Sequence, residues 1–260
     1  MRYTPGVNGK NDLDVLWSDD DYVAIAKPAG LATIPGRAEL DSVLERLGAQ
    51  LGLPAAGLID PRLRVVHRLD KHTSGLLLFA KNVTAQRHLS HQFQNNLVQK
   101  EYLALIYGRP TTEEGEIEAA LAPHPSSPQR MTVVRHGGRP ARTLWKLEER
   151  YRGYSLLRVF PKTGKTHQIR VHLKHAGLPL TIDPLYNPPP PGKPAGLLLS
   201  SFKRGYKLPS GETERPLIDR LTLHAERLSF LLPSGSRVEL TAPLPKDFRA
   251  ALNQLRRHGR

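Results

Sequence analysis

The densest cluster of polar side chains in this sequence runs from residue 67 to 75, as HRLDKHTSG. Apolar residues flank the cluster on both sides, so we expect a loop between two strands that displays Asp70 at the end of a sheet. A carboxylate among cations is ionised at neutral pH, which suits a nucleophile or general base better than a general acid. The competing interpretation is that Asp70 caps a turn with Thr73 and Ser74, and spacing alone favours it.

The positive charge of the chain is concentrated around two single carboxylates. Lys and Arg number 38 against 24 Asp and Glu, which gives a formal net charge of +14. Residues 61–100 hold seven basic residues with one acid, Asp70, and residues 151–200 hold seven with one acid, Asp183. Such a field attracts polyanions, of which nucleic acid is the commonest large one. A solvated basic surface that only maintains solubility is the alternative.

Several chemistries are excluded or disfavoured by composition and motif. The chain has no cysteine, which removes disulfides, thiolate catalysis and Cys-ligated zinc. Neither a Gly-rich phosphate loop nor a Gly-x-Ser-x-Gly elbow occurs in the sequence. His167, His172 and His175 lie close together, but no acid falls within that stretch, so metal binding is disfavoured. No segment approaches the ~20 apolar residues of a membrane span, and we expect a cytoplasmic protein.

The elements around these residues can be predicted from periodicity and turn signals. Two strands are expected within residues 14–27 and a helix from Asp41 or Ser42, followed by a strand over 76–82 and a helix from Thr84. Further strands are predicted over 97–108, 143–151 and 154–160, with short hairpins between 108 and 140. A last hairpin turns at residues 234–235, and a basic helix ends the chain. Because strands outnumber helices without regular alternation, the fold class is α+β with a largely antiparallel sheet.

Residues 162–179 are ambiguous by periodicity. Ile169, Val171 and Leu173 alternate as in a strand, but Thr166 as N-cap and Gly177 as C-cap favour a helix, which we predict. The segment NPPPPGKPAG, residues 187–196, predicts an extended polyproline surface insertion. Neither an internal repeat nor a linker is evident.

The sequence resembles one known family across almost its whole length. His67-Arg68-Leu69-Asp70 with the following TSGL is similar to the HRLDxxTSGL signature of the RluA-type RNA pseudouridine synthases. Five further segments resemble family motifs in the same order: KPAGL from Lys27, KEYLALIYG from Lys100, GKTHQIRVH from Gly164, DPLY from Asp183 and LHAERLSF from Leu223. Six segments in the same order as in the family argue against chance agreement.

This resemblance implies roles for individual residues. Asp70 corresponds to the catalytic aspartate that initiates cleavage of the C1′–N1 bond before the base is rejoined through C5. Attack on the ribose, attack on the uracil and removal of a ribose proton all stay open. Arg170 matches the arginine that pairs with this carboxylate, and Tyr102 the aromatic that packs on the target base. Arg68 matches the residue associated with holding the site of the flipped nucleotide open.

The resemblance also implies the wider setting of the site. It implies the pseudouridine synthase fold, a mixed sheet flanked by helices and loops with a catalytic cleft across it. The expected organisation is a leader over residues 1–15 and one catalytic domain over 16–260, without the S4-like module that many family members carry. Lys165 stands where the family often has Arg, and Ile182 where it usually has Gly. Further substrate-binding residues are expected at six positions, namely Arg68, His67, Thr73, Lys165, His167 and Gln168.

As an isomerisation, the implied reaction needs no cofactor and no metal. The implied partner is structured RNA, either ribosomal or transfer RNA, bound by a monomer. A non-catalytic RNA-binding or ribosome-assembly factor descended from the family is the alternative function. A metal-dependent hydrolase that uses the histidine cluster is a third hypothesis.

Overall fold

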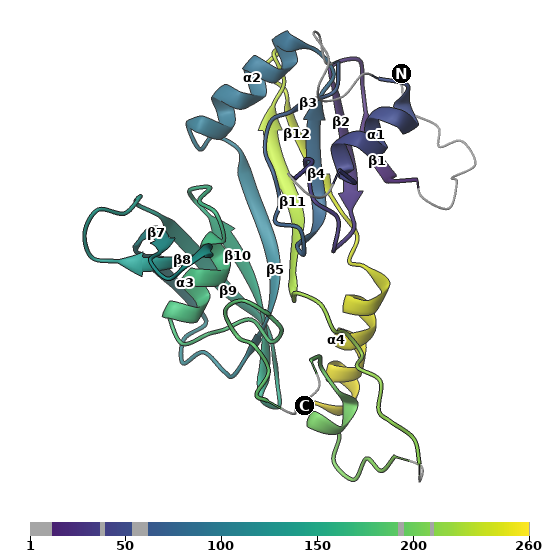
Figure 1. The fold of residues 1–260 in the computed structure, drawn as a ribbon, viewed down its shortest axis with the longest axis vertical. Coiled ribbons are helices and arrows are strands. Elements are labelled where there is room, and N and C mark those ends of the chain that lie inside the picture. The colour runs from purple at the N-terminus through teal and green to yellow at the C-terminus, as the bar shows by residue number, and fades with distance from the viewer. Residues whose placement is uncertain (1–11, 37–39, 54–61, 192–194, 209–210, 260) are drawn as a thin grey trace. The chain divides into compact units, whose positions relative to one another are not determined.

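The computed structural model describes residues 12–36, 40–53, 62–191, 195–208 and 211–259, and the chain forms two compact units (Figure 1). The first unit comprises Met1–Lys100 and Ala225–Pro243, and the second comprises Glu101–His224 and Leu244–Arg260. Each unit is therefore built from two stretches that are distant in sequence. Residues 1–11 of the predicted leader lie outside the described residues, and the first strand already begins at Asp14. The single catalytic domain over residues 16–260 stays a prediction.

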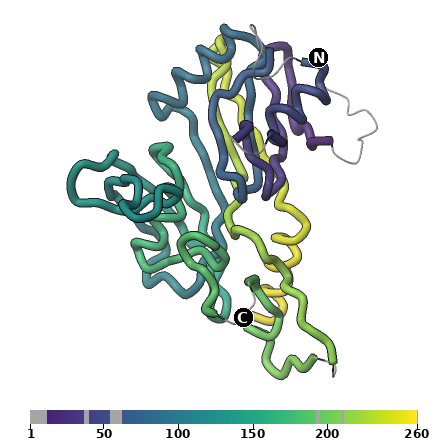
Figure 2. Tube along the Cα trace, in the orientation of Figure 1, coloured from purple at the N-terminus to yellow at the C-terminus, as the bar shows by residue number. Residues whose placement is uncertain are grey.

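The first unit is a sheet with two helices. Its strands follow the order β1 (Asp14–Ser18), β2 (Tyr22–Lys27), β4 (Ser74–Ala80) and β11 (Leu223–Leu231), with β12 (Arg237–Thr241) on β11 and β3 (Arg64–Val65) on β4. Strand β2 pairs antiparallel with both β1 and β4, and β12 pairs antiparallel with β11. The tube in Figure 2 shows the yellow-green strands from the end of the chain beside the purple and blue strands from its beginning.

The core of the first unit explains why the sequence of β4 is largely an unbroken apolar run. All seven residues of β4 are buried, because side chains on both of its faces are covered. Leu76 and Leu78 pack with Tyr22 of β2, Phe230 of β11 and Leu89 of α2 (Val83–Gln94).

The two helices of the first unit begin with side-chain caps. In α1 (Val43–Leu51), Ser42 accepts a hydrogen bond from the backbone of Glu45, as predicted. In α2, Asn82 accepts one from the backbone of Ala85, so this helix begins one residue earlier than expected. The N-terminal turns of both helices are therefore satisfied locally.

The second unit contains an antiparallel sheet in the order β5 (Gln99–Tyr107), β10 (Tyr154–Pro161), β9 (Arg142–Tyr151) and β6 (Glu114–Glu118). Each face of this sheet is covered by one helix. On one face, Leu103 and Leu105 of β5 pack with Phe248 and Leu252 of α4 (Lys246–His258). On the other, Ala104 and Ile106 belong to the cluster that contains Ile169 and Leu173 of α3 (Gln168–His175). The alternation along β5 thus separates the two helices.

A bulge in β9 changes which face its side chains occupy. Leu157 of β10 is opposite Leu147, whereas Leu156 is opposite Glu149, so one residue of β9 is extra at this point. Trp145 and Leu147 consequently lie on the α3 face, while Tyr151 lies on the α4 face.

The remaining elements lie beside α3. The hairpin of β7 (Ala120–His124) and β8 (Ser127–Val134) contacts α3, and Leu121 packs with Val171 and Tyr186. In the predicted proline-rich insertion, residues 188–190 are exposed and outside regular secondary structure, and residues 192–194 lie outside the described residues. A single turn of 3-10 helix, η1 (Leu199–Ser201), follows.

The α+β class and the largely antiparallel pairing are confirmed. The prediction of a helix over 166–177 is also confirmed, but its N-cap is His167, in a left-handed conformation with φ of 54°, instead of Thr166. The observed C-cap is Ala176, and the predicted cap Gly177 follows it in a left-handed conformation with φ of 74°, so the helix ends one residue earlier than expected. Among the described residues, no helix combines the length and apolar character that crossing a bilayer requires.

Candidate active site

In the first unit, the loop that carries Asp70 leads from β3 into β4 and is held by a buried lysine. Lys27, 1% exposed at the end of β2, donates from Nζ to the carbonyl oxygens of Pro28, Leu31 and Lys71 at 2.8, 2.6 and 2.9 Å. The backbone N–H of Gly30 also donates to the Lys71 carbonyl at 2.9 Å. An ammonium group has three protons, and these three acceptors match them. Lys27 therefore ties the residue after Asp70 to the loop that follows β2.

A threonine secures the residue before Asp70. Thr33, 4% exposed, donates from Oγ1 to the Leu69 carbonyl at 3.0 Å, and the same oxygen accepts from the Leu69 N–H at 3.2 Å. The Thr73 N–H donates to the Asp70 carbonyl at 3.1 Å and closes a turn. The half-buried Asp70 side chain thus projects from a backbone fixed on both sides.

The glycine of the TSGL segment is required by backbone packing. Gly75 has φ of 121°, and a Cβ placed there would lie 2.1 Å from the carbonyl oxygen of Ala225 in β11. Only glycine permits both this conformation and this approach. Thr73 and Ser74, just before it, are buried at 2% and 0% exposure. Buried residues therefore define where the loop ends and β4 begins.

The two residues before Leu69 have different environments. His67 stacks on Phe93 with ring centroids 4.5 Å apart, and its Nε2 accepts a hydrogen bond from the Leu78 N–H at 3.0 Å. Burial lowers the pKa of His67 to about 3, with a further contribution from the positive charge of Lys100. His67 is consequently a neutral ring that fastens the loop to β4. Arg68, in contrast, is exposed.

In the second unit, Tyr102 is a half-buried residue of β5 and faces Val159 of β10. It packs against the cluster that contains Ile169 of α3, so Tyr102 and the start of α3 share one face of the sheet. Its neighbour Glu101 is ion-paired with Arg158 at 2.9 Å. The strand position and the cluster together restrict how the ring can move.

The segment before α3 is organised by the side chain of Gln168, 4% exposed. Its Oε1 accepts hydrogen bonds from Thr163 Oγ1 at 2.7 Å and from the Lys165 N–H at 3.0 Å. Its Nε2 donates to the Arg142 carbonyl at 3.0 Å and to Thr143 Oγ1 at 2.9 Å. Both ends of this amide are used within the protein, so Gln168 connects the loop to β9. Its contact with a substrate stays a prediction.

Arg170 lies on the buried side of α3 and forms a two-pronged ion pair with Asp183. Its Nε donates to Asp183 Oδ2 at 2.8 Å and its Nη2 to Oδ1 at 2.7 Å, with the two side chains 4% and 1% exposed. Asp183 Oδ1 also accepts from the N–H groups of Leu185 and Tyr186 at 3.0 and 3.1 Å. The carboxylate thus both orients the guanidinium and caps the turn that follows. The predicted pairing of Arg170 with Asp70 stays a prediction.

Tyr186 links this ion pair to the left-handed residue before α3. The Arg170 guanidinium lies over its ring, 5.0 Å from the centroid. The Tyr186 hydroxyl is 2.8 Å from His167 Nδ1 and accepts from the Met131 N–H at 2.8 Å. The positive φ of His167 is therefore accompanied by a side-chain contact that holds its ring in place.

The three clustered histidines do not share a common centre. His167 contacts Tyr186, and His172 contacts Thr143 Oγ1 at 2.9 Å and the Ala119 carbonyl at 3.1 Å. Burial lowers the pKa of His172, and His175 is exposed. Within the described residues, no three His, Asp or Glu side chains gather as a metal site requires.

The predicted site residues divide between the two units. Those of the first unit lie in one loop, namely His67, Arg68, Asp70 and Thr73, and those of the second lie on β5 or at the start of α3, namely Tyr102, Lys165, His167, Gln168 and Arg170. Sequence reasoning missed the roles of Lys27, Asp183 and Tyr186. A signal existed for Asp183, because it is the only acid in a basic stretch of fifty residues.

Comparisons with known proteins agree with this arrangement of motifs. Residues 21–175 match the family described as RNA pseudouridylate synthase. That match covers more than half of the chain and includes the loop of Asp70, strand β5 and helix α3. The chain belongs to the RNA pseudouridylate synthase family.

Curated relatives carry the name ribosomal large subunit pseudouridine synthase D. The protein from Neisseria meningitidis serogroup B is 36% identical over 249 residues, which are 94% of this chain and 61% of the relative. The protein from Xanthomonas campestris pv. campestris is 38% identical over 250 residues, or 94% of this chain and 70% of the relative. This chain thus spans 61% to 70% of the length of these two relatives.

Solved structures confirm the predicted pseudouridine synthase fold. Human RNA pseudouridylate synthase domain containing 1 matches with a TM-score of 0.69 at 23% identity, covering 94% of this chain and 87% of that one. Human RNA pseudouridylate synthase domain containing 4 matches with a TM-score of 0.68 at 25% identity, covering 94% and 93%.

Proposed function

We propose that this protein is an RNA pseudouridine synthase, an isomerase that converts uridine to pseudouridine in large-subunit ribosomal RNA, with Asp70 as its catalytic carboxylate. The observation that carries the proposal is the loop of Asp70, fixed by Lys27 on one side and by Thr33 on the other within a family match. A nucleophile or base benefits from such preorganisation, because the geometry does not have to be assembled during the reaction. The names of the relatives favour ribosomal RNA, and transfer RNA is a second substrate class to test.

The proposed reaction conserves atoms and electrons. The C1′–N1 bond of the target uridine breaks, the uracil turns while it is held in the site, and a C1′–C5 bond forms. The proton on C5 is lost and N1 gains one, so product and substrate are isomers. The Asp70 carboxylate initiates the cleavage as nucleophile or base. The exchange involves no oxidant, reductant or group donor, and we propose that the enzyme acts without a cofactor.

Tyr102 and Arg170 have supporting roles in this proposal. A uridine must leave its stack to reach the carboxylate, which costs a few kcal/mol. Stacking on an aromatic ring such as Tyr102 returns ~1–3 kcal/mol. Arg170 keeps a guanidinium at the site, oriented by Asp183 on one side. Arg68 is exposed and suited to occupy the place that the extruded nucleotide leaves.

RNA binding in this proposal depends on the excess of positive charge. The net charge of +14 raises the local concentration of a polyanion and accelerates encounter with it. Most of the affinity of such an encounter comes from phosphates, and its strength falls with salt. A monomeric chain in the cytoplasm, where ribosomal RNA is found, fits this proposal.

The test compares Asp70→Asn with Asp20→Asn, which removes the charge of an exposed aspartate in the same unit. Each protein is incubated with a transcript of large-subunit ribosomal RNA, and pseudouridine is mapped along the transcript. We expect Asp70→Asn to abolish the product while RNA affinity changes by less than about threefold, and Asp20→Asn to resemble the wild type.

Full activity in Asp70→Asn would refute the assignment of the carboxylate. Absence of pseudouridine from ribosomal and transfer RNA alike, with RNA binding retained by the wild-type protein, would instead favour a non-catalytic RNA-binding factor. A parallel pseudouridine map of total RNA with and without the gene product identifies the target uridines.

A further inference from the structure

Five cationic or titratable side chains line a pocket of about 400 Å³ in the second unit. They come from three separate stretches of the chain: the turn between β9 and β10, the segment after η1, and the end of α4. The lining residues are Arg152, Lys203, Arg204, Arg257 and His258. None of them belongs to the predicted catalytic or substrate-binding set. Among the residues that the structure describes, the lining of this pocket contains basic side chains and no acidic one.

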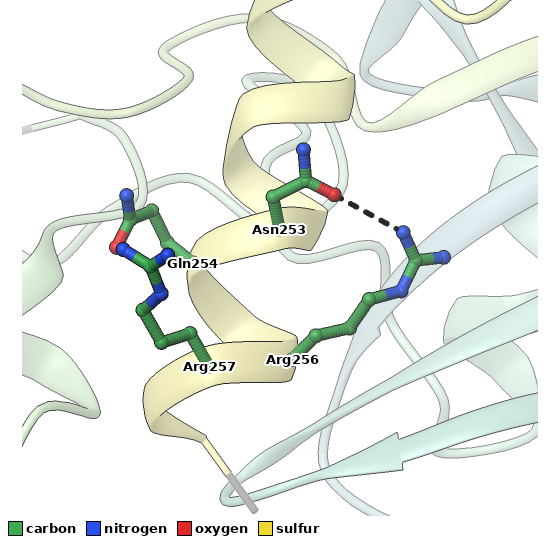
Figure 3. Close-up of a pocket in the computed structure, with 4 residues that line it drawn as sticks. All are labelled: Asn253, Gln254, Arg256 and Arg257. Carbon is green, nitrogen blue, oxygen red and sulfur yellow. Dashed lines mark hydrogen bonds between the residues drawn. The ribbon is translucent and has the colours of Figure 1, made fainter.

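Two adjacent arginines of helix α4, Arg256 and Arg257, have different surroundings. Figure 3 shows Arg256 and Arg257 extending to different sides of the helix. Arg256 is ion-paired with Glu149 of β9 at 2.5 Å and also donates to Asn253 at 3.3 Å. Arg257 is exposed and, among the described residues, has no acidic partner. Arg256 therefore serves to attach the helix to the sheet, whereas Arg257 contributes its charge to the pocket.

The simplest explanation for basic residues at the end of α4 is the helix dipole. The last turn of a helix has a partial negative charge that favours basic residues, and Arg257 and His258 lie there. That explanation does not extend to Lys203 and Arg204, which follow η1, or to Arg152 in a β-turn. Arginines that gather from separate stretches without a carboxylate repel one another, so a bound anion would relieve the repulsion.

The behaviour of His258 agrees with a positive potential in the pocket. Its pKa is lowered by desolvation and by the positive charges of Lys203 and Arg257. The Lys203 ammonium lies 5.6 Å from the centre of the Tyr206 ring, which helps to hold it in place. The pocket therefore combines four permanent cations with a histidine whose protonation their charge disfavours.

We propose that this pocket binds a backbone phosphate of the substrate RNA. Arginine presents a planar set of donors that matches the non-bridging oxygens of a phosphodiester, and lysine adds a point charge. Three arginines and one lysine around a single pocket suit one such group. Identifying the anion as RNA rests on the proposed function, whereas the recognition of phosphate follows from the lining residues alone. The site fixes the position of the RNA and reads no sequence.

The experiment measures the salt dependence of RNA binding by the full chain. The variant Arg204→Ala/Arg257→Ala removes two exposed arginines from the pocket, and Arg249→Ala/Arg256→Ala removes two from the same helix outside the pocket. Affinity for a large-subunit ribosomal RNA transcript is measured between 50 and 200 mM salt. The two variants lose the same charge, so a difference between them reports the place of the charge.

Each lost phosphate contact lowers the log–log slope by about 0.9, equivalent to about 3.5-fold in affinity over this fourfold range of salt. We expect the pocket variant to lose at least one such contact and the control variant to lose less. Circular dichroism and thermal unfolding verify that both variants are folded. Pseudouridine formation by the pocket variant at saturating RNA should equal that of the wild type, with an increased KM.

Equal slopes in the pocket and control variants would overturn the proposal. The proposal would also be overturned if inorganic phosphate bound to the wild type in a calorimetric titration but the pocket variant and the wild type had the same salt slope for RNA binding. The proposed function fails separately, if the wild type makes no pseudouridine. If the wild type is inactive but the pocket variant still has a smaller salt slope than the control variant, the phosphate site is supported and only the enzyme assignment fails.

Discussion

Two arginine–carboxylate pairs in the second unit have nearly the same geometry and opposite exposure. Arg170 and Asp183 are 4% and 1% exposed, whereas Arg256 and Glu149 are 41% and 30% exposed. Replacing Asp183 by Asn removes a carboxylate that is paired with a buried guanidinium, and breaking a buried pair in this way typically costs about 3–5 kcal/mol. Replacing Glu149 by Gln breaks a solvated pair and should cost about 0–1 kcal/mol. We therefore expect Asp183→Asn to lower the free energy of unfolding several times more than Glu149→Gln.

The measurement is a urea titration of each variant followed by circular dichroism. In the double variant Arg170→Met/Asp183→Asn, the Asn oxygen still accepts from the backbone of Leu185 and Tyr186, but the buried guanidinium is gone. Comparison with Asp183→Asn therefore isolates the cost of burying Arg170 without the Asp183 carboxylate. We expect the double variant to be more stable than Asp183→Asn alone. The reasoning is refuted if Asp183→Asn and Glu149→Gln destabilise equally, or if removal of the arginine makes Asp183→Asn worse.

Two further predictions concern the first unit. Gly75→Ala should lower the free energy of unfolding by about 3–5 kcal/mol, because the new Cβ meets the Ala225 carbonyl and the backbone has a positive φ. Gly235→Ala is the control, because Gly235 also has a positive φ (82°) but open space around it, and its loss should be about 1–2 kcal/mol. Equal losses in thermal or urea unfolding would contradict the steric reason. His67 has a pKa of about 3 in the folded protein against an ordinary value near 6.5, so the unfolded chain binds its proton first and stability should fall by up to ~1.4 kcal/mol per pH unit from pH 6.5 towards 3. In His67→Gln, whose amide oxygen can accept from Leu78, that part of the pH dependence should disappear, and an unchanged profile would show that another group causes it.

Local patterns predicted the elements of this protein well. The apolar run after residue 75, the cap at Ser42 and the glycines at the turns each depend on residues close in sequence, and each is present in the structure. The helix that carries Arg170 was also correctly predicted, since the glycine at its C-terminal end is a local signal. Its beginning was not, because the left-handed conformation of His167 is accompanied by a contact with Tyr186, nineteen residues further on.

Partners across long separations could not be predicted from the residue types alone. Asp183 is thirteen residues from Arg170, and Lys71 is forty-four residues from Lys27. Which partner each of these cations contacts depends on a turn or loop whose path is determined by the packing of the unit. The motifs placed Lys27 and Asp183 in the right family segments, but only the coordinates connect them to the backbone that holds Asp70 and to the guanidinium of Arg170.

The interleaved order of the two units has a consequence for synthesis on the ribosome. Strand β4 is buried on both faces and needs β11 beside it, yet Ala225 is translated about 145 residues after Ala80. At 5–20 residues per second, the apolar edge of β4 waits roughly 7–30 s for its neighbour. During that interval the Gly75 backbone, which Ala225 will press against, is open to other strands. Nascent chains that stall before residue 225 should therefore be the species that chaperones bind, even though the loop of Asp70 has long been made.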